Sequence, residues 1–139
     1  MFELSDFYTY CREHQVDVIP YPGCPAAGAT VRDLDVLAIF LDFTKILTTR
    51  TLRGVCFHEL GHTATGALHK VDSPFELVER SEYRAKRWGA QQFLTEEAFR
   101  TAFQDGCREL WELSEYFDLP EDVVADAYHY WADCRGVRF

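Results

Sequence analysis

Basic residues are scarce in this sequence and form no cluster. The 139 residues include 14 lysines and arginines against 23 aspartates and glutamates, so the formal net charge is −9. Phosphate backbones repel such a chain, which excludes nucleic acid as an expected direct partner. The charge would suit a basic protein partner, although it is also typical of soluble proteins in general.

Long hydrophobic runs are absent as well. The longest aliphatic run covers residues 36–41, whereas a membrane-spanning helix needs about 20 apolar residues. Residues 1–6 are acidic and lack the positive region and apolar run of a signal peptide. We therefore expect no membrane partner.

The five cysteines are widely scattered, and none of them belongs to a C-x-x-C pair. An odd number of scattered cysteines indicates reduced thiols and not a disulfide framework, and reduced thiols are typical of the cytoplasm. We therefore expect a cytoplasmic protein.

The chain does contain enough apolar material for one packed domain over residues 1–139, with 47% hydrophobic and 15% aromatic residues. The expected fold is α+β, with a small twisted sheet of about three strands packed on an active-site helix and a mainly helical C-terminal half. We divide the domain into a helix and sheet (1–47), two site helices (48–94) and a helical C-terminal region (95–139). Apolar spacing and turn residues predict strands near 16–19 and 37–43, a loop at 24–29, and helices near 3–14, 50–67, 74–94, 95–103, 107–117 and 120–131.

The most informative stretch is His58-Glu59-Leu60-Gly61-His62, an H-E-x-x-H pattern on the helix expected at 50–67. Residues four apart share one face of a helix, so the two imidazoles can bind one metal ion. Glu59 projects beside them and could take the proton of a metal-activated water. Gly61 leaves room for a neighbouring element to approach closely.

A third ligand is expected on the next helix, which Ser73-Pro74-Phe75-Glu76 should start as a capping box. Helical geometry places Glu82 inside the apolar stripe of this helix and Glu79 at its margin. A buried carboxylate is costly unless it is paired or binds metal, which favours Glu82 as the ligand. The alternative is that Glu82 pairs with an arginine such as Arg53 or reaches solvent.

The spacing of the motif separates two classes of zinc protease. Metzincins require glycine three residues and histidine six residues after the second motif histidine, followed by a methionine turn. Here Gly66 and His69 come one position too late, and Met1 is the only methionine. A glutamate 20 residues beyond His62 resembles the gluzincin arrangement instead.

Three segments together resemble the ImmA/IrrE family of metallo-endopeptidases: Ile39-Phe40-Leu41-Asp42, the His58–His62 motif, and Glu82-Tyr83-Arg84-Ala85-Lys86-Arg87-Trp88-Gly89. The family pattern after the third ligand is E-x-x-A-x-x-(F/W)-A, and Gly89 replaces its last alanine. The resemblance implies a cytosolic protease, often encoded by phages or mobile elements, that cleaves a helix-turn-helix repressor. It also implies that substrate adds as a strand along the sheet edge, here at Leu37 to Phe43.

The resulting hypothesis is a zinc endopeptidase with His58, His62 and Glu82 as metal ligands. Three protein ligands leave one position for water, and Glu59 would pass the proton of that water to the leaving amine. The residue that assists the oxyanion stays open among four candidates, His69, Tyr83, Tyr128 and His129.

Other functions stay open beside this hypothesis. The same fold could bind a transcription factor without cutting it, or act as another zinc hydrolase on an amidated small molecule. Cys24 could occupy the metal as an inhibitory ligand, although a loop thiol is more often inert. Residues 107–134 superficially suggest a helix-turn-helix, but their eight acids and one arginine argue against DNA readout.

Overall fold

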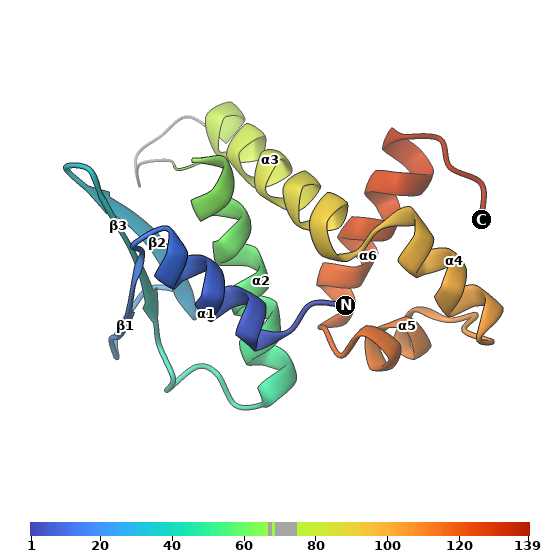
Figure 1. Cartoon of the computed structure of the whole chain (residues 1–139), viewed down its shortest axis with the longest axis horizontal. Helices are drawn as coiled ribbons and strands as arrows, with labels where there is room; N and C mark the ends of the chain where they lie inside the picture. Colours follow the sequence, from blue (N-terminus) through green and yellow to red (C-terminus); the bar gives the residue numbers. More distant parts are fainter. Residues whose placement is uncertain (67, 69–74) are drawn as a thin grey trace.

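The computed structural model describes residues 1–66, 68 and 75–139. Within these ranges the chain forms six α-helices, three strands and a π-helical turn, so the α+β prediction is confirmed (Figure 1). No helix in the described ranges has the length and apolar character needed to cross a bilayer. The order is α1 (Leu4–Glu13), β1 (Asp17–Pro20), β2 (Gly28–Asp33), β3 (Val36–Leu41), α2 (Thr49–Thr65), α3 (Phe75–Phe93), α4 (Glu96–Gln104), α5 (Leu110–Phe117), α6 (Glu121–His129) and η1 (Tyr130–Cys134).

The sheet lies on one side of α2, and α4, α5 and α6 lie on the other (Figure 1). Its strand order is β1-β3-β2, with β3 parallel to β1 and antiparallel to β2. The expectation that substrate adds along Leu37 to Phe43 is therefore wrong, because β3 is paired on both sides. Among the described strands, the edge strand that contacts α2 is β2.

Strand β2 is absent from the sequence-based expectations, and the loop expected at 24–29 overlaps its first two residues. The turn at Leu34-Asp35 joins β2 to β3, so that Asp33 pairs with Val36. Leu34 has a φ of 55°, in a region where glycine or asparagine is usual in such hairpins. The hairpin was missed because this turn carries no glycine.

Helix α2 begins and ends where its capping residues predict. The Thr48 hydroxyl accepts a hydrogen bond from the Thr51 amide at 3.0 Å, and Gly66 ends the helix in the left-handed conformation. Helix α3 starts at Phe75 and ends at Phe93, close to its expected range. The capping box proposed for residues 73–76 lies outside the described residues.

Three other helix boundaries differ from expectation. Helix α1 starts at Leu4 and not at residue 3, because Glu3 forms the capping box of that helix with Asp6. Helix α5 starts at Leu110 and not near 107, because the Glu112 carboxylate accepts hydrogen bonds from the two amides before the helix. The last α-helix gives way after His129 to the π-helical turn η1.

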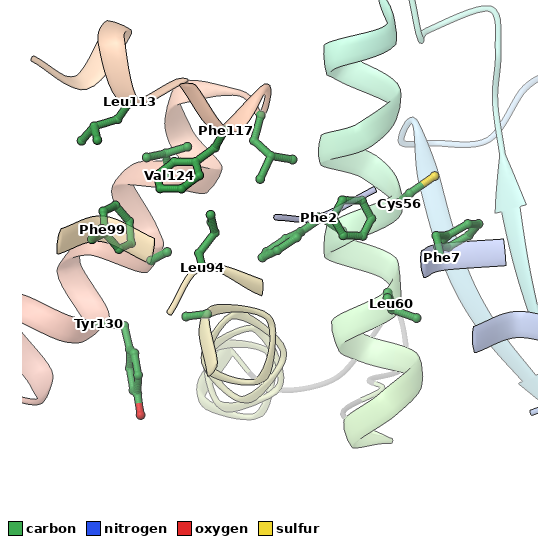
Figure 2. Packing of buried hydrophobic residues seen from close by; sticks show 14 of the residues in the cluster. Phe2, Phe7, Cys56, Leu60, Leu94, Phe99, Leu113, Phe117, Val124 and Tyr130 are labelled. Carbon is green, nitrogen blue, oxygen red and sulfur yellow. The ribbon is translucent and has the colours of Figure 1, made fainter. Parts of the chain in front are cut away.

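The core surrounds α2 and joins it to both halves of the chain (Figure 2). Phe2 is fully buried and makes edge-to-face contacts with Phe57 of α2 and Phe93 of α3, with ring centroids 5.4 and 5.1 Å apart. In the C-terminal helices, Phe99 contacts Phe117 with the centroids 5.3 Å apart. The start of the chain thus fixes the position of α2 and α3 relative to each other.

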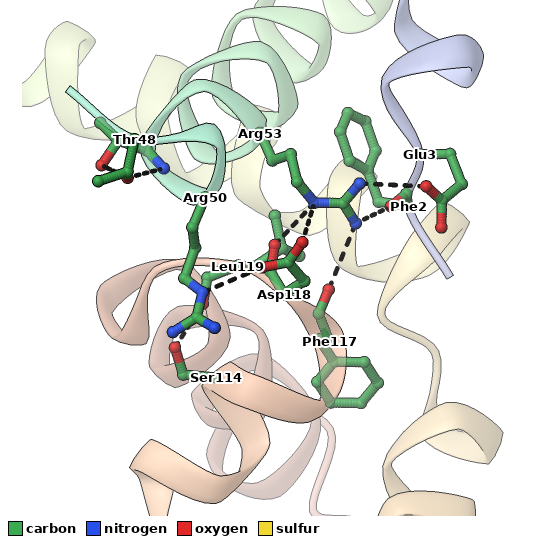
Figure 3. A network of polar contacts seen from close by, with 10 residues as sticks. Phe2, Glu3, Thr48, Arg50, Arg53, Ser114, Phe117, Asp118 and Leu119 are labelled. Atoms are coloured by element: carbon green, nitrogen blue, oxygen red, sulfur yellow. Dashed lines mark hydrogen bonds and ion pairs between the residues drawn. The ribbon is translucent and has the colours of Figure 1, made fainter. Parts of the chain in front are cut away.

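The N-terminal part of α2 also carries a buried cation (Figure 3). Arg53 donates from Nε to the Asp118 carbonyl at 2.8 Å and from Nη1 to the Glu3 carboxylate at 3.1 Å. Its Nη2 donates to the Phe2 carbonyl and, at 3.4 Å, to the Phe117 carbonyl. We call these contacts the Arg53 network. Because every guanidinium nitrogen has an acceptor here, Arg53 is not the partner of Glu82.

Candidate metal centre

The structure brings together the three residues expected to bind a metal. His58 and His62 lie one turn apart on α2, with their Nε2 atoms 3.2 Å apart. Glu82 of α3 lies opposite, with Oε1 3.1 Å from His62 Nε2 and Oε2 3.3 Å from His58 Nε2. We call these three side chains the metal-ligand group, since their nitrogen and oxygen atoms can bind one metal ion.

The spacing of the metal-ligand group fits a metal ion. A tetrahedral ion bound at about 2.0–2.1 Å to nitrogen and oxygen separates its ligand atoms by about 3.3 Å. The two Nε2 atoms are 3.2 Å apart, His62 Nε2 is 3.1 Å from Glu82 Oε1, and His58 Nε2 is 3.3 Å from Glu82 Oε2. The imidazole nitrogens and the carboxylate oxygens can all act as acceptors, and such a cluster is stabilised either by shared protons or by a cation.

Close packing of α2 on α3 sets this geometry. A Cβ atom added to Gly61 would lie 2.6 Å from the Ala85 carbonyl oxygen, a separation that side chains do not tolerate. The prediction that Gly61 allows close approach is therefore confirmed. Gly61 precedes His62, and Ala85 lies one turn beyond Glu82, so the same contact places a ligand of α2 against a ligand of α3.

Burial and electrostatics distinguish Glu82 from its neighbour Glu79. The Glu82 side chain is 31% exposed, whereas Glu79 is an exposed residue. The hydrogen bond with His62 lowers the pKa of Glu82 below its ordinary value; partial burial opposes this shift, and the charges of His58 and His62 reinforce it. Glu82 is therefore the glutamate suited to a cation.

Glu59 is buried between α2 and the edge strand β2. Thr30 donates a hydrogen bond from Oγ1 to Glu59 Oε2 at 2.5 Å. A Cβ atom added to Gly28 would lie 2.6 Å from Val55 Cγ1 and 3.1 Å from Glu59 Cγ, so the absence of a side chain at Gly28 makes room for both residues of α2. Sequence reasoning missed both β2 residues; the one signal for them was the β-branched pair Thr30-Val31.

Two cavities meet at Glu82. The first has a volume of about 510 Å³ and lies between β2, α2, α3 and α6; His58, Glu59 and Glu82 line it. The second, of about 540 Å³, lies between α3 and the C-terminal helices. Lys86 and Asp126 line both cavities and form an ion pair of 3.1 Å, so a salt bridge from α3 to α6 separates them.

Three of the four candidates for the residue that assists the oxyanion lie in the described ranges, and they do not share one cavity. Tyr83 and His129 line the second cavity with Glu82. Tyr128 lines neither cavity and packs instead against Phe99 and Phe139, with ring centroids 5.9 and 5.5 Å away. His69 lies outside the described residues.

The Cys24 side chain forms its hydrogen bond within its own loop. Its thiol donates to the Tyr21 carbonyl at 3.3 Å, and its own carbonyl accepts a hydrogen bond from Lys45. The thiol is buried and does not belong to the metal-ligand group. In this structure Cys24 does not act as an inhibitory ligand.

The chain matches no protein-family model, no curated protein and no solved structure.

Proposed function

We propose that the protein is a zinc-dependent endopeptidase similar to the ImmA/IrrE family. The observation that carries this proposal is the convergence of the His58 and His62 Nε2 atoms on the Glu82 carboxylate, with nitrogen–nitrogen and nitrogen–oxygen separations of 3.1 to 3.3 Å, next to the buried carboxylate of Glu59. Two imidazoles and one carboxylate are a common ligand set of catalytic zinc, which keeps a fourth position open. Bound zinc would supply Lewis-acid activation of water and of a substrate carbonyl.

Glu59 has the role of general base in this proposal. Its neighbour in sequence is a metal ligand, it lines the same cavity, and Thr30 fixes one carboxylate oxygen by a hydrogen bond. The other oxygen can then accept the proton of the attacking water and deliver it to the leaving amine. Zinc binding alone does not need a carboxylate at this position, which favours a hydrolase over a binding protein.

The surroundings of the site support a protein substrate. An extended peptide can pair with the edge strand β2, whose residues Gly28 and Thr30 contact Glu59. The two cavities on either side of the Lys86–Asp126 ion pair offer separate spaces for side chains of such a peptide. The family resemblance and the net charge of −9 favour a basic helix-turn-helix repressor.

The direct test incubates the zinc-loaded protein with the helix-turn-helix protein encoded beside it, and follows cleavage by mass spectrometry. We expect Glu59→Gln to cut at least about a hundredfold more slowly, which is the low end of general-base catalysis. Glutamine keeps an oxygen that can accept the Thr30 hydrogen bond, so the variant should fold and bind zinc.

The matched control is Glu79→Gln, which removes an exposed charge beside the site and should cleave at the wild-type rate. Equal cleavage by wild type and Glu59→Gln would contradict the assigned base. Binding of the repressor without cleavage by either protein would favour the non-cleaving regulator.

A further inference from the structure

A second group of reactive side chains lies at the C-terminal end of α6, apart from the metal-ligand group. His129 Nδ1 is 2.7 Å from the Asp133 carboxylate, and His129 Nε2 is 3.8 Å from the Cys134 thiol. The side chains of His129 and Asp133 are 65% and 67% exposed, and Cys134 is exposed. A thiol, an imidazole and a carboxylate thus lie in a row at the surface.

The π-helical turn η1 creates this arrangement. In an α-helix, residues five apart point about 140° away from each other. In a π-helix the hydrogen bond runs from residue i+5 to residue i, and the wider turn brings residues five apart to within about 50°. The Arg135 amide donates to the Tyr130 carbonyl at 3.0 Å, which is this five-residue bond. The π-helical turn is therefore what places Cys134 beside His129.

Asp133 determines which nitrogen of His129 faces the thiol as an acceptor. Because the carboxylate accepts a hydrogen bond from Nδ1, the neutral imidazole carries its proton there and presents the lone pair of Nε2 to Cys134. The thiol can then donate to Nε2 and transfer its proton, and the imidazolium that forms is stabilised by Asp133. Only the thiolate is an effective nucleophile.

The other cysteines offer an internal comparison. Of the five, all in the described part of the chain, only Cys134 is exposed. Burial raises the pKa of Cys11 to about 11 and that of Cys56 to about 12, so both thiols stay protonated at neutral pH. Burial also raises the pKa of Cys107. Cys134 is thus the thiol with both access and a base.

We propose that Cys134 is a site of reversible thiol–disulfide exchange with low-molecular-weight disulfides of the glutathione type. The Cys134 sulfur attacks one sulfur of the small disulfide while His129 takes the thiol proton. A new S–S bond forms to Cys134, the original S–S bond breaks, and the leaving thiolate takes the proton back from His129. The products are one mixed disulfide and one small thiol, so no further oxidant is needed. This site does not depend on the metal-ligand group.

The test exposes the reduced full chain to glutathione disulfide at pH 7 and measures the adduct on each cysteine by peptide mass spectrometry. We expect the first adduct at Cys134 and none at that peptide in Cys134→Ser. Exposure alone would also favour Cys134, so the informative variant is His129→Gln. It should slow the adduct on the order of tenfold, because a thiol without a neighbouring base is only a few per cent thiolate at neutral pH.

Two further variants make the result decisive. His14→Gln is the matched control, because His14 is exposed but bonds to the Tyr10 carbonyl and not to a thiol; it should react at the wild-type rate. Asp133→Asn should slow the adduct less than His129→Gln does, since the base remains. Wild-type rates in both His129→Gln and Asp133→Asn would overturn the proposal, as would a first adduct on a buried cysteine.

Discussion

Helix α2 contributes side chains to two polar groups, the Arg53 network and the metal-ligand group. The two groups differ in how their hydrogen-bonding atoms are paired. In the Arg53 network, one buried cation donates to carbonyl and carboxylate oxygens from both ends of the chain. In the metal-ligand group, the two imidazole Nε2 atoms lie 3.2 Å apart, and each lies 3.1 or 3.3 Å from a different oxygen of the Glu82 carboxylate. The first group contains its own cation, whereas the second is made of residues that could hold one.

This difference separates a structural role from a functional one. A buried cation whose every nitrogen has an acceptor joins segments together and is not available to a ligand. Converging acceptors repel one another unless a proton or metal ion lies between them, so their arrangement is stable only with a bound proton or cation. The comparison predicts that changes to the Arg53 network alter folding, while changes to the metal-ligand group alter metal binding.

The largest expected effect is on stability, from Arg53→Met. Methionine retains much of the apolar stem but removes the donors to three carbonyls, and a buried acceptor left without a partner costs about 1–3 kcal/mol, so the free energy of unfolding should fall by about 3–5 kcal/mol. Urea denaturation measures this change. The control is Arg50→Met, because Arg50 and Asp118 form a partly exposed ion pair of 3.0 Å that is worth about 1 kcal/mol at most. Equal losses in the two variants would show that the network is no more than a surface contact.

The next effect is on metal affinity, from Glu82→Ala. Changes to residues that merely support a ligand weaken metal binding by about 10- to 100-fold, so loss of the ligand itself should weaken it at least about a hundredfold. Calorimetric titration with zinc measures the affinity. At a zinc concentration about 100 times the wild-type Kd, zinc should stabilise wild type by about 2.7 kcal/mol and leave Glu82→Ala nearly unchanged. Glu79→Ala should bind zinc as wild type does. Full zinc affinity in Glu82→Ala would show that Glu82 is not a ligand.

A smaller effect is expected from Gly61→Ala, which acts on the contact between the two site helices. The added methyl group would meet the Ala85 carbonyl, and such overpacking costs about 1–3 kcal/mol. Zinc affinity should fall as well, because α3 carries Glu82 away from His62 when it moves. Thermal unfolding with and without zinc measures both. At an exposed helical position, replacing glycine by alanine usually stabilises the protein. If Gly61→Ala were likewise more stable than wild type, α3 would have shifted to admit the methyl group without strain.

The metal-ligand group was predictable from the sequence because it depends on helical geometry alone. His58 and His62 share a face by their spacing, and the apolar stripe of α3 distinguishes Glu82 from Glu79 by position on the helix alone. These predictions needed only that two helices form and pack. The alternative partner Arg53 could not be excluded in advance, because its acceptors come from Phe2 and Asp118, residues far away in the sequence.

The residues around Glu59 were not predictable in the same way. Strand β2 has no regular alternation of apolar residues, and its hairpin turn carries Leu34 where glycine would have marked it. Thr30 is recognisable as a partner of Glu59 only after the sheet is placed against α2. The π-helical turn at Tyr130–Cys134 had no sequence signal, so the neighbourhood of His129 and Cys134 came from the structure alone.

The smallest effect concerns Glu3, the carboxylate partner of Arg53, and tests what satisfies the buried cation. The Glu3 side chain is 56% exposed, so solvent weakens its attraction to Arg53, and Glu3→Gln should lower the free energy of unfolding by about 1 kcal/mol or less. The carbonyls of Phe2, Phe117 and Asp118 remain as acceptors in this variant. A urea-denaturation loss as large as that of Arg53→Met would mean that the ion pair, and not the carbonyls, stabilises Arg53. The Arg53 network would then resemble the metal-ligand group in what stabilises it, because both groups would depend on pairing one carboxylate with one cation.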